Sequence, residues 1–155
     1  MHGKVVLRPI GAVRGGRAEA LDDSWDAVEA VIALDETQFS AEALTGLSDF
    51  SHIEVIFHFD RVAPGQIVSA ARHPRGRSDW PKAGIFAQRG KARPNRLGVS
   101  ICRLLSVDGL NLTVRGLDAI AGTPVLDIKP VMQGFLPRGE IRQPAWATEI
   151  IQDYW

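Results

Sequence analysis

Alternation between apolar and polar positions is clearest near the middle of the chain, in the stretch FSHIEVIFHF at 50–59. One side of an extended chain would carry only apolar residues there: Ile53, Val55, Phe57 and Phe59. The other side would carry His52, Glu54 and His58. A period of two residues predicts a strand with one buried face. We therefore predict a strand over 50–59, with its histidines in structural rather than catalytic positions.

Six further segments have the composition or alternation of strands. They are Lys4–Arg14, Trp25–Leu34, Gly84–Gln88, Leu97–Val107, Leu110–Arg115 and Thr123–Pro130. Trp25–Leu34 could also form a short helix, but its alternating apolar residues favour a strand. Asp108 and Gly109 predict a hairpin turn between the two strands that flank them.

Helical signals are few. Ser40–Leu47 begins with a capping residue and predicts a helical turn. The tail begins with Pro144, and its apolar residues recur at helical spacing, which predicts a C-terminal helix. Arg61–Lys82 contains three prolines, two glycines and no sustained period, so we predict a long loop.

Many short strands, hairpin turns and a few short helices predict a mainly β fold, a small β-barrel. No glycine-rich G-x-G-x-x-G turn follows the first strand, which argues against a Rossmann nucleotide fold. A chain of 155 residues with 45% hydrophobic residues is the usual size and composition of one globular domain, here residues 1–155.

Composition narrows the range of functions. The formal net charge is zero, so no overall field would draw the protein onto nucleic acid, and an anionic ligand must be held by local charges. One cysteine excludes a disulfide framework, and four scattered histidines suggest no metal site. We expect no signal peptide, no membrane association and a cytoplasmic location, because no apolar run approaches 18 residues.

Local positive charge is concentrated between residues 72 and 96, where a single acid, Asp79, accompanies eight basic residues. These are Arg72, Arg75, Arg77, Lys82, Arg89, Lys91, Arg93 and Arg96. The segment is either a solvated loop or a site for phosphate or carboxylate. The Pro94-Asn95 turn favours the site, because proline fixes the backbone and asparagine tolerates a left-handed conformation.

Two other segments are candidates for ligand binding. Asp60 and Arg61 follow the central strand, where they would form either part of the mouth of the barrel or a surface ion pair. The bend within 116–129 offers backbone amides to a polar ligand, or is a plain turn. Ser100 and Cys102 have no acid and histidine partners at a recognisable spacing, which argues against nucleophilic catalysis.

Three blocks together resemble one family: FSHI at 50–53, GIFAQRGKARPNRLGVS at 84–100 and GLDAIAGTPVLDIKP at 116–130. In order and spacing they resemble the signature of the TsaA-like (TrmO-like) proteins, from about Ile10 to Pro130. The resemblance implies a TsaA-like β-barrel that binds S-adenosylmethionine (S-adenosyl-L-methionine) without a Rossmann domain, usually as a homodimer. It also implies N6-methylation of threonylcarbamoyladenosine next to the tRNA anticodon.

The resemblance assigns roles position by position. Residues matching the cofactor site are Asp60, Arg61, Arg89, Arg93, Pro94, Asn95, Gly98, Val99, Ser100, Ile120, Ala121, Gly122 and Thr123. The cations expected to face nucleic acid are Arg72, Arg75, Arg77, Lys91 and Arg96. No general base identifies itself; Asp60 and Asp127 are the candidates.

The sequence departs from the family at several places. LDDSWDA at 21–27 stands where many members have P-R-Q-P-G, and Ala121 replaces an acid before Gly-Thr. Asp60 and Arg61 stand where many members have His-Gln. Two alternatives therefore stay open: the same barrel methylating another RNA or a small molecule, and a noncatalytic protein that binds the cofactor. Four tryptophans, two of them in the tail, support the homodimer or simply close one barrel end.

Overall fold

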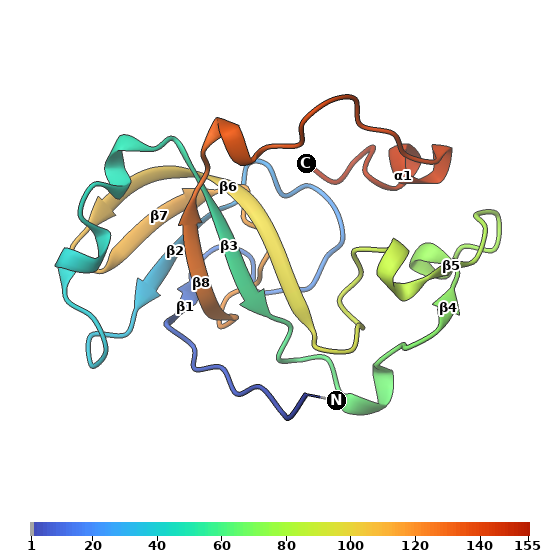
Figure 1. The fold of residues 1–155 in the computed structure, drawn as a ribbon, viewed down its shortest axis with the longest axis horizontal. Coiled ribbons are helices and arrows are strands. Elements are labelled where there is room, and N and C mark those ends of the chain that lie inside the picture. The colour runs from blue at the N-terminus through green and yellow to red at the C-terminus, as the bar shows by residue number, and fades with distance from the viewer. Residues whose placement is uncertain (1) are drawn as a thin grey trace.

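A closed barrel of six antiparallel strands organises the protein, in a computed structural model that describes residues 2–155 (Figure 1). Around the barrel the order is β1-β2-β7-β6-β3-β8. Their bounds are β1 Gly11–Arg14, β2 Glu29–Leu34, β3 His52–His58, β6 Leu97–Asp108, β7 Asn111–Arg115 and β8 Pro124–Pro130. The prediction of a mainly β barrel is confirmed.

The core of the barrel follows directly from the alternation in β3. Ile53, Val55 and Phe57 are each no more than 1% exposed, while the polar residues between them lie on the outer side. The inner positions of β6 are also buried, and the register places Gly98 opposite Phe57. Burial of these apolar side chains is the main source of the barrel's stability.

Short helices and a second, small sheet lie outside the barrel. The sheet pairs β4 (Ala71–Arg72) with β5 (Ala83–Gly84), within the excursion that leads from β3 to β6. The 3₁₀ helices are η1 Ala41–Leu44, η2 Leu47–Asp49, η3 Pro64–Gln66, η4 Pro74–Gly76, η5 Ile85–Ala87 and η6 Gln133–Phe135. The one α-helix of residues 2–155 is α1 (Ala145–Ile150), which confirms the predicted C-terminal helix.

Three predicted strands are shorter by four or more residues in the structure. The predicted Trp25–Leu34 strand is reduced to β2, which begins at Glu29. β1 begins at Gly11 and not at Lys4, because the residues before Ile10 pair with no other strand; Val5 and Val6 are 77% and 80% exposed. The segment 84–88 contributes only its first residue to β5, because the next three form η5 and bury Ile85. β-Branched composition alone does not supply the pairing partner that a strand needs.

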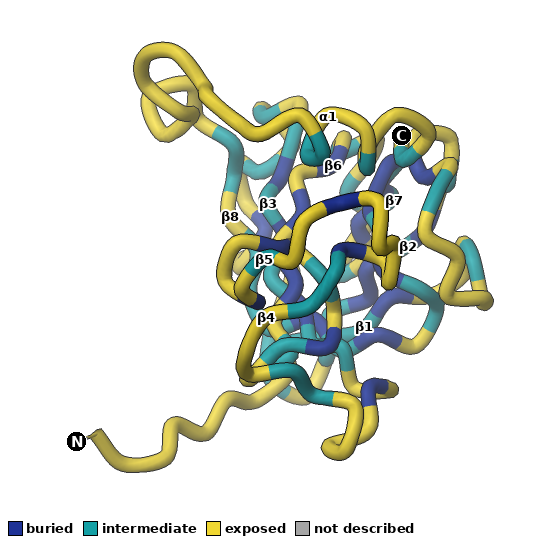
Figure 2. The backbone as a smooth tube through the Cα atoms, turned by 90° about the vertical axis from the view of Figure 1, so that its right-hand side faces the viewer, coloured by how far each residue is buried: buried dark blue, intermediate teal, exposed yellow. Residues whose placement is uncertain are grey.

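The C-terminal tail returns across the molecule toward the excursion, so that α1 lies near β4 and β5 (Figure 1). Trp80 Nε1 donates a hydrogen bond to Glu149 Oε2 at 2.6 Å, and this bond joins the segment between β4 and β5 to α1. The amides of Ser24 and Trp25 donate to the carbonyls of Asp153 and Tyr154, each at 2.9 Å. Most of the tail stays exposed along its outer side (Figure 2). No helix within residues 2–155 has the length and apolar character needed to cross a membrane.

Candidate functional site

Buried polar side chains fix the shape of the basic segment 85–96. Gln88 is 7% exposed, and its Nε2 donates to the carbonyl oxygens of Ala83 at 2.7 Å and Arg72 at 3.0 Å. The segment is thereby tied to both strands of the small sheet. A buried amide with two partners holds a loop in one conformation, so the cations beside it are presented from a fixed frame.

Two of the arginines belong to this frame. Arg93 Nη1 donates to the carbonyl of Gln88 at 2.8 Å, and Arg96 Nη1 donates to the carbonyl of Val62 at 2.7 Å. The expected left-handed residue is also different: Arg96 has a φ of 51°, while Asn95 does not have a positive φ. The predicted turn is present, with the Arg96 amide donating to the Arg93 carbonyl at 3.0 Å, but the left-handed conformation falls one residue later.

Arg89 connects the basic segment to the barrel. Its Nη2 donates to the carbonyl of Val99 in β6 at 2.9 Å. This part of β6 does not pair with β7, because the pairing of β6 with β7 begins at Arg103. Next to it, Ser100 is 5% exposed and its Oγ has no hydrogen-bond partner within residues 2–155. A buried hydroxyl without a partner is a position that a bound polar ligand or a water would satisfy.

The bend before β8 is held by its backbone. The amides of Ala121, Gly122 and Thr123 donate to the carbonyls of Arg17, Val13 and Ile120 at 2.8, 2.7 and 3.1 Å. These three amides are therefore engaged within the chain, and ligand binding by the other amides of the bend stays a prediction. Gly122 has a φ of 90°, a conformation in which other residues are strained.

Arg61 links the end of β3 to the same bend. Its Nη2 donates to the carbonyl of Ala121 at 3.2 Å, and its side chain is exposed, as is that of Asp60. Residues 60 positions apart in the sequence are thereby brought together. Arg61 and Arg89 are both exposed guanidinium groups and each is anchored by one bond to a backbone carbonyl, which leaves other N–H groups for an anionic ligand.

The five cations expected to face nucleic acid differ in their surroundings. Arg75 makes two bonds to the carboxylate of Asp23, at 2.8 and 3.2 Å. Arg77 pairs with Asp79 and lies 3.9 Å above the ring of Trp80. Arg96 belongs to the loop frame, and Arg72 has a buried Nε without a partner among the described residues. Lys91 is exposed and has no acidic partner within residues 2–155.

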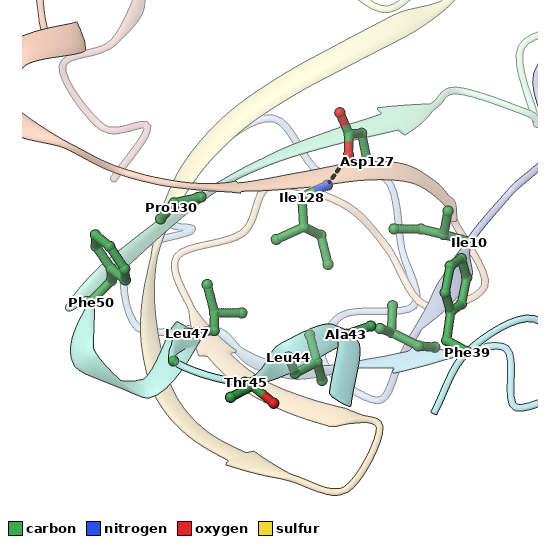
Figure 3. Close-up of a pocket in the computed structure, with 12 residues that line it drawn as sticks. Ile10, Phe39, Ala43, Leu44, Thr45, Leu47, Phe50, Asp127, Ile128 and Pro130 are labelled. Carbon is green, nitrogen blue, oxygen red and sulfur yellow. Dashed lines mark hydrogen bonds between the residues drawn. The ribbon is translucent and has the colours of Figure 1, made fainter. Parts of the chain in front are cut away.

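The structure also contains an open hollow of about 480 Å³ that none of these cations lines (Figure 3). It lies between β8 and the η1–η2 segment and is lined by Ile10, Leu34, Phe39, Leu44, Leu47, Phe50 and Ile128, among others. Of the candidate site residues only Asp127 reaches it, and that carboxylate pairs with Lys129 at 3.3 Å. An apolar hollow suits a charged ligand poorly, so we assign the candidate site to the region of Arg61 and Arg89.

Two residues at the site were not found from the sequence. The Tyr154 hydroxyl donates to Asp118 Oδ2, and Asp118 Oδ1 is buried with no partner among residues 2–155. Burial and the nearby Asp118 carboxylate raise the pKa of Tyr154 above its usual value, while Arg89 acts in the opposite direction.

Burial raises the pKa of the Cys102 thiol to about 12, so Cys102 carries no thiolate at neutral pH.

The sequence of this chain is similar to a protein family and to several characterised relatives. Residues 22–135 match the model of the tRNA-methyltransferase O N-terminal domain. A probable S-adenosyl-L-methionine-binding protein of Pyrococcus abyssi is 36% identical over 89% of this chain and 74% of its own length. The tRNA (adenine(37)-N6)-methyltransferase of Escherichia coli is 38% identical over 70% of this chain, which spans only 46% of that relative.

Solved structures agree with the sequence comparison. The crystal structure of TrmO from Pseudomonas aeruginosa superposes with a TM-score of 0.72 and 28% identity, covering 90% of this chain and 62% of that one. The matched family model spans well over half of the chain, and the barrel agrees with the solved fold. The chain therefore belongs to the family of the tRNA-methyltransferase O N-terminal domain.

Proposed function

We propose that this protein is an S-adenosylmethionine-dependent methyltransferase that methylates N6 of threonylcarbamoyladenosine beside the tRNA anticodon. One observation carries the proposal: β3 pairs with β6 on one side and with β8 on the other, so the strands that carry the family's three motif blocks are neighbours in the barrel. At the end of β3, Arg61 bonds to the bend before β8, and Arg89 ties the basic segment to β6. Relatives named as methyltransferases or S-adenosylmethionine-binding proteins support it. An enzyme that modifies tRNA works where tRNA is, so we also propose a cytoplasmic location.

The residues present fit the cofactor. Its methionine carboxylate needs a cation, and Arg61 and Arg89 offer exposed guanidinium groups. The buried Ser100 hydroxyl lacks a partner within residues 2–155 and lies one residue from the carbonyl that Arg89 contacts. The cofactor supplies a sulfonium-activated methyl carbon, so the chain's task is to bind, align and exclude water. Asp60, which is exposed beside Arg61, is our candidate to accept the proton that the acceptor nitrogen loses.

The direct test uses purified protein, S-adenosylmethionine and unmodified or threonylcarbamoylated tRNA, with nucleoside mass spectrometry as the measurement. We expect methylation of the threonylcarbamoyl nucleoside only. Arg89→Ala should weaken cofactor binding by about 1–3 kcal/mol, if a charge-assisted bond is lost. Cofactor binding by the wild type without any methylated nucleoside would favour another acceptor, which the zero net charge also suits. No calorimetric heat with the cofactor would contradict the proposal itself.

Lys91 should contribute most to RNA binding among the five cations. Arg75 and Arg77 already pair with acids, and each would exchange one anion for another on meeting a phosphate. Replacing Lys91 with alanine should reduce the slope of log affinity against log salt by roughly one unit. The exposed Lys4, in the N-terminal segment, provides the control: Lys4→Ala should leave the slope unchanged. An unchanged slope in Lys91→Ala would exclude a phosphate contact there.

We also propose that the protein is a homodimer that uses the outer face of β6. Leu97, Val99, Ile101 and Leu105 are apolar residues on that face, each 36–46% exposed, with the exposed Arg103 between the last two. Exposed apolar residues gathered on one strand face are typical of interfaces. Sedimentation at tens of micromolar protein should give a dimer, and Ile101→Glu with Leu105→Glu should give monomers. Met132→Glu, at a position that is 44% exposed but outside the strand, should stay dimeric. A monomeric wild type would refute the dimer.

A further inference from the structure

Phe86 is exposed to solvent, although neighbouring buried residues hold the backbone around it in place. Its side chain is 79% exposed, although Ile85, the residue before it in η5, is buried. Ile85 is 1% exposed, and its amide donates to the carbonyl of Ala70 at 2.9 Å. Gln88, two residues further, is buried and bonded to both strands of the small sheet.

This anchoring prevents Phe86 from turning inward. With Ile85 and Gln88 occupying the inner side of the turn, rotation of η5 would expose an isoleucine and break the bonds of a buried amide. An aromatic ring of this size is normally among the most buried side chains of a protein. Phe86 is therefore presented to solvent by a rigid support, and its exposure is not the consequence of a loose loop.

The surroundings of Phe86 carry positive charge. Lys82, Arg89 and Lys91 are all exposed within five residues of it. The nearest acid along the chain, Asp79, is paired with Arg77. An aromatic ring among cations suits an unpaired nucleic-acid base, because the ring stacks on the base while the cations meet the flanking phosphates. An apolar protein partner would have to bury those charges without compensation.

We propose that Phe86 is the stacking platform for an unpaired base of the RNA acceptor, in the single-stranded loop that contains the methylated adenosine. The inference rests on the proposed function and adds the residue that recognises the acceptor. Each of three residues has a separate role. Lys91 neutralises a phosphate, Arg89 lies between the cofactor region and the loop, and Phe86 holds a base by its face.

Stacking and charge neutralisation have different signatures. Loss of a phosphate contact lowers the slope of log affinity against log salt, whereas loss of a stacked base lowers the affinity and leaves the slope unchanged. Phe86→Ala should therefore weaken binding of a tRNA anticodon stem-loop roughly five- to 150-fold, the range of one base–aromatic stack. The salt slope and the affinity for S-adenosylmethionine should both match the wild type. Phe86→Trp should retain the RNA affinity.

A matched control comes from Phe135 in η6, which is 88% exposed. Phe135→Ala removes the same ring from another 3₁₀ helix and should leave RNA binding unchanged. The loop base is tested from the RNA side, with stem-loops that carry an abasic site at single loop positions. One of these should lose affinity for the wild type by the same factor as Phe86→Ala, and combining it with Phe86→Ala should cause no further loss.

Several other results overturn the inference. RNA affinity that is unchanged in Phe86→Ala refutes stacking, as does a loss that also changes the salt slope. If Phe86→Ala converts a dimer to monomers at full RNA affinity per protomer, the ring belongs to a protein interface. A wild type that binds cofactor but no RNA removes both the stacking platform and the tRNA acceptor. RNA binding without methylation removes the catalytic proposal and leaves the role of Phe86 standing on the affinity data.

Discussion

Replacing Gly98 with alanine should lower the free energy of unfolding by about 1–3 kcal/mol, the usual cost of overpacking a core. Gly98 in β6 lies directly opposite Phe57 in β3, and the ring of Phe57 covers the glycine. An added methyl group would overlap three ring carbons, including Cδ2 at 2.9 Å. Phe57 is 1% exposed and packs edge-on against Phe59, with ring centres 5.2 Å apart, so the ring has no free space to enter.

Denaturant unfolding measures this effect, and Gly84→Ala is the matched control. Gly84 has a φ of −58° and no atom within 4 Å of an added methyl group, so alanine there should be neutral or stabilise by about 0.4–1 kcal/mol. A melting temperature lower by roughly 2–4 °C per kcal/mol is expected for Gly98→Ala in a chain of this length. Equal stability of Gly98→Ala and the wild type would show that the Phe57 ring relocates without cost.

The barrel could be predicted from the sequence because its signal is local. Alternation in β3 predicts which side chains face inward, and Asp108-Gly109 predicts the hairpin between β6 and β7. The pairing of Gly98 with Phe57 could not be predicted, because it depends on the register of two strands about 40 residues apart. A glycine in a strand pattern indicates a close approach, but not which side chain approaches.

The candidate site was predictable in outline for a different reason. The family resemblance locates Arg61, Arg89 and the 120–123 bend. In the structure the end of β3 pairs with the start of β6 and the start of β8, and Arg61 and Arg89 bond to the bend and to β6 respectively. The resemblance does not distinguish the cations that face a ligand from those that support a loop. Arg93 and Arg96 belong to the second class because backbone carbonyls lie within reach of their guanidinium groups. That property depends on the folded path of the backbone and has no signal in charge spacing.

Asp118 and Tyr154 were missed because they are 36 positions apart and form one unit only when the tail folds back. A tyrosine near the C-terminus and an aspartate after a strand are each unremarkable in the sequence. The tail also lies beyond the residues that match the family model, so the resemblance offers no role for it. Together the two residues attach the end of the chain beside Arg89, whose charge acts on Tyr154.

Removal of the Tyr154 hydroxyl should release the tail. Tyr154 is the one hydrogen-bond donor to the Asp118 side chain among residues 2–155, and the other carboxylate oxygen is buried and unpaired. Tyr154→Phe therefore leaves a partly buried carboxylate without a donor, which costs about 1.5–3 kcal/mol for a bond to a charged group. Tyr154→Phe combined with Asp118→Asn should recover part of this loss, because the unpaired charge is gone.

The hydrogen-exchange rates of two backbone amides measure the release of the tail. Those of Ser24 and Trp25 donate to the carbonyls of Asp153 and Tyr154, so both should exchange faster in Tyr154→Phe, while amides of β3 keep their protection. The pKa of Tyr154 is raised in the folded protein, so the stability that its hydroxyl contributes is complete below pH 10 and is lost as the pH rises further. The difference in unfolding free energy between wild type and Tyr154→Phe should accordingly shrink above pH 10. Unchanged exchange at Ser24 and Trp25 would mean that the backbone bonds hold the tail without the Tyr154 hydroxyl.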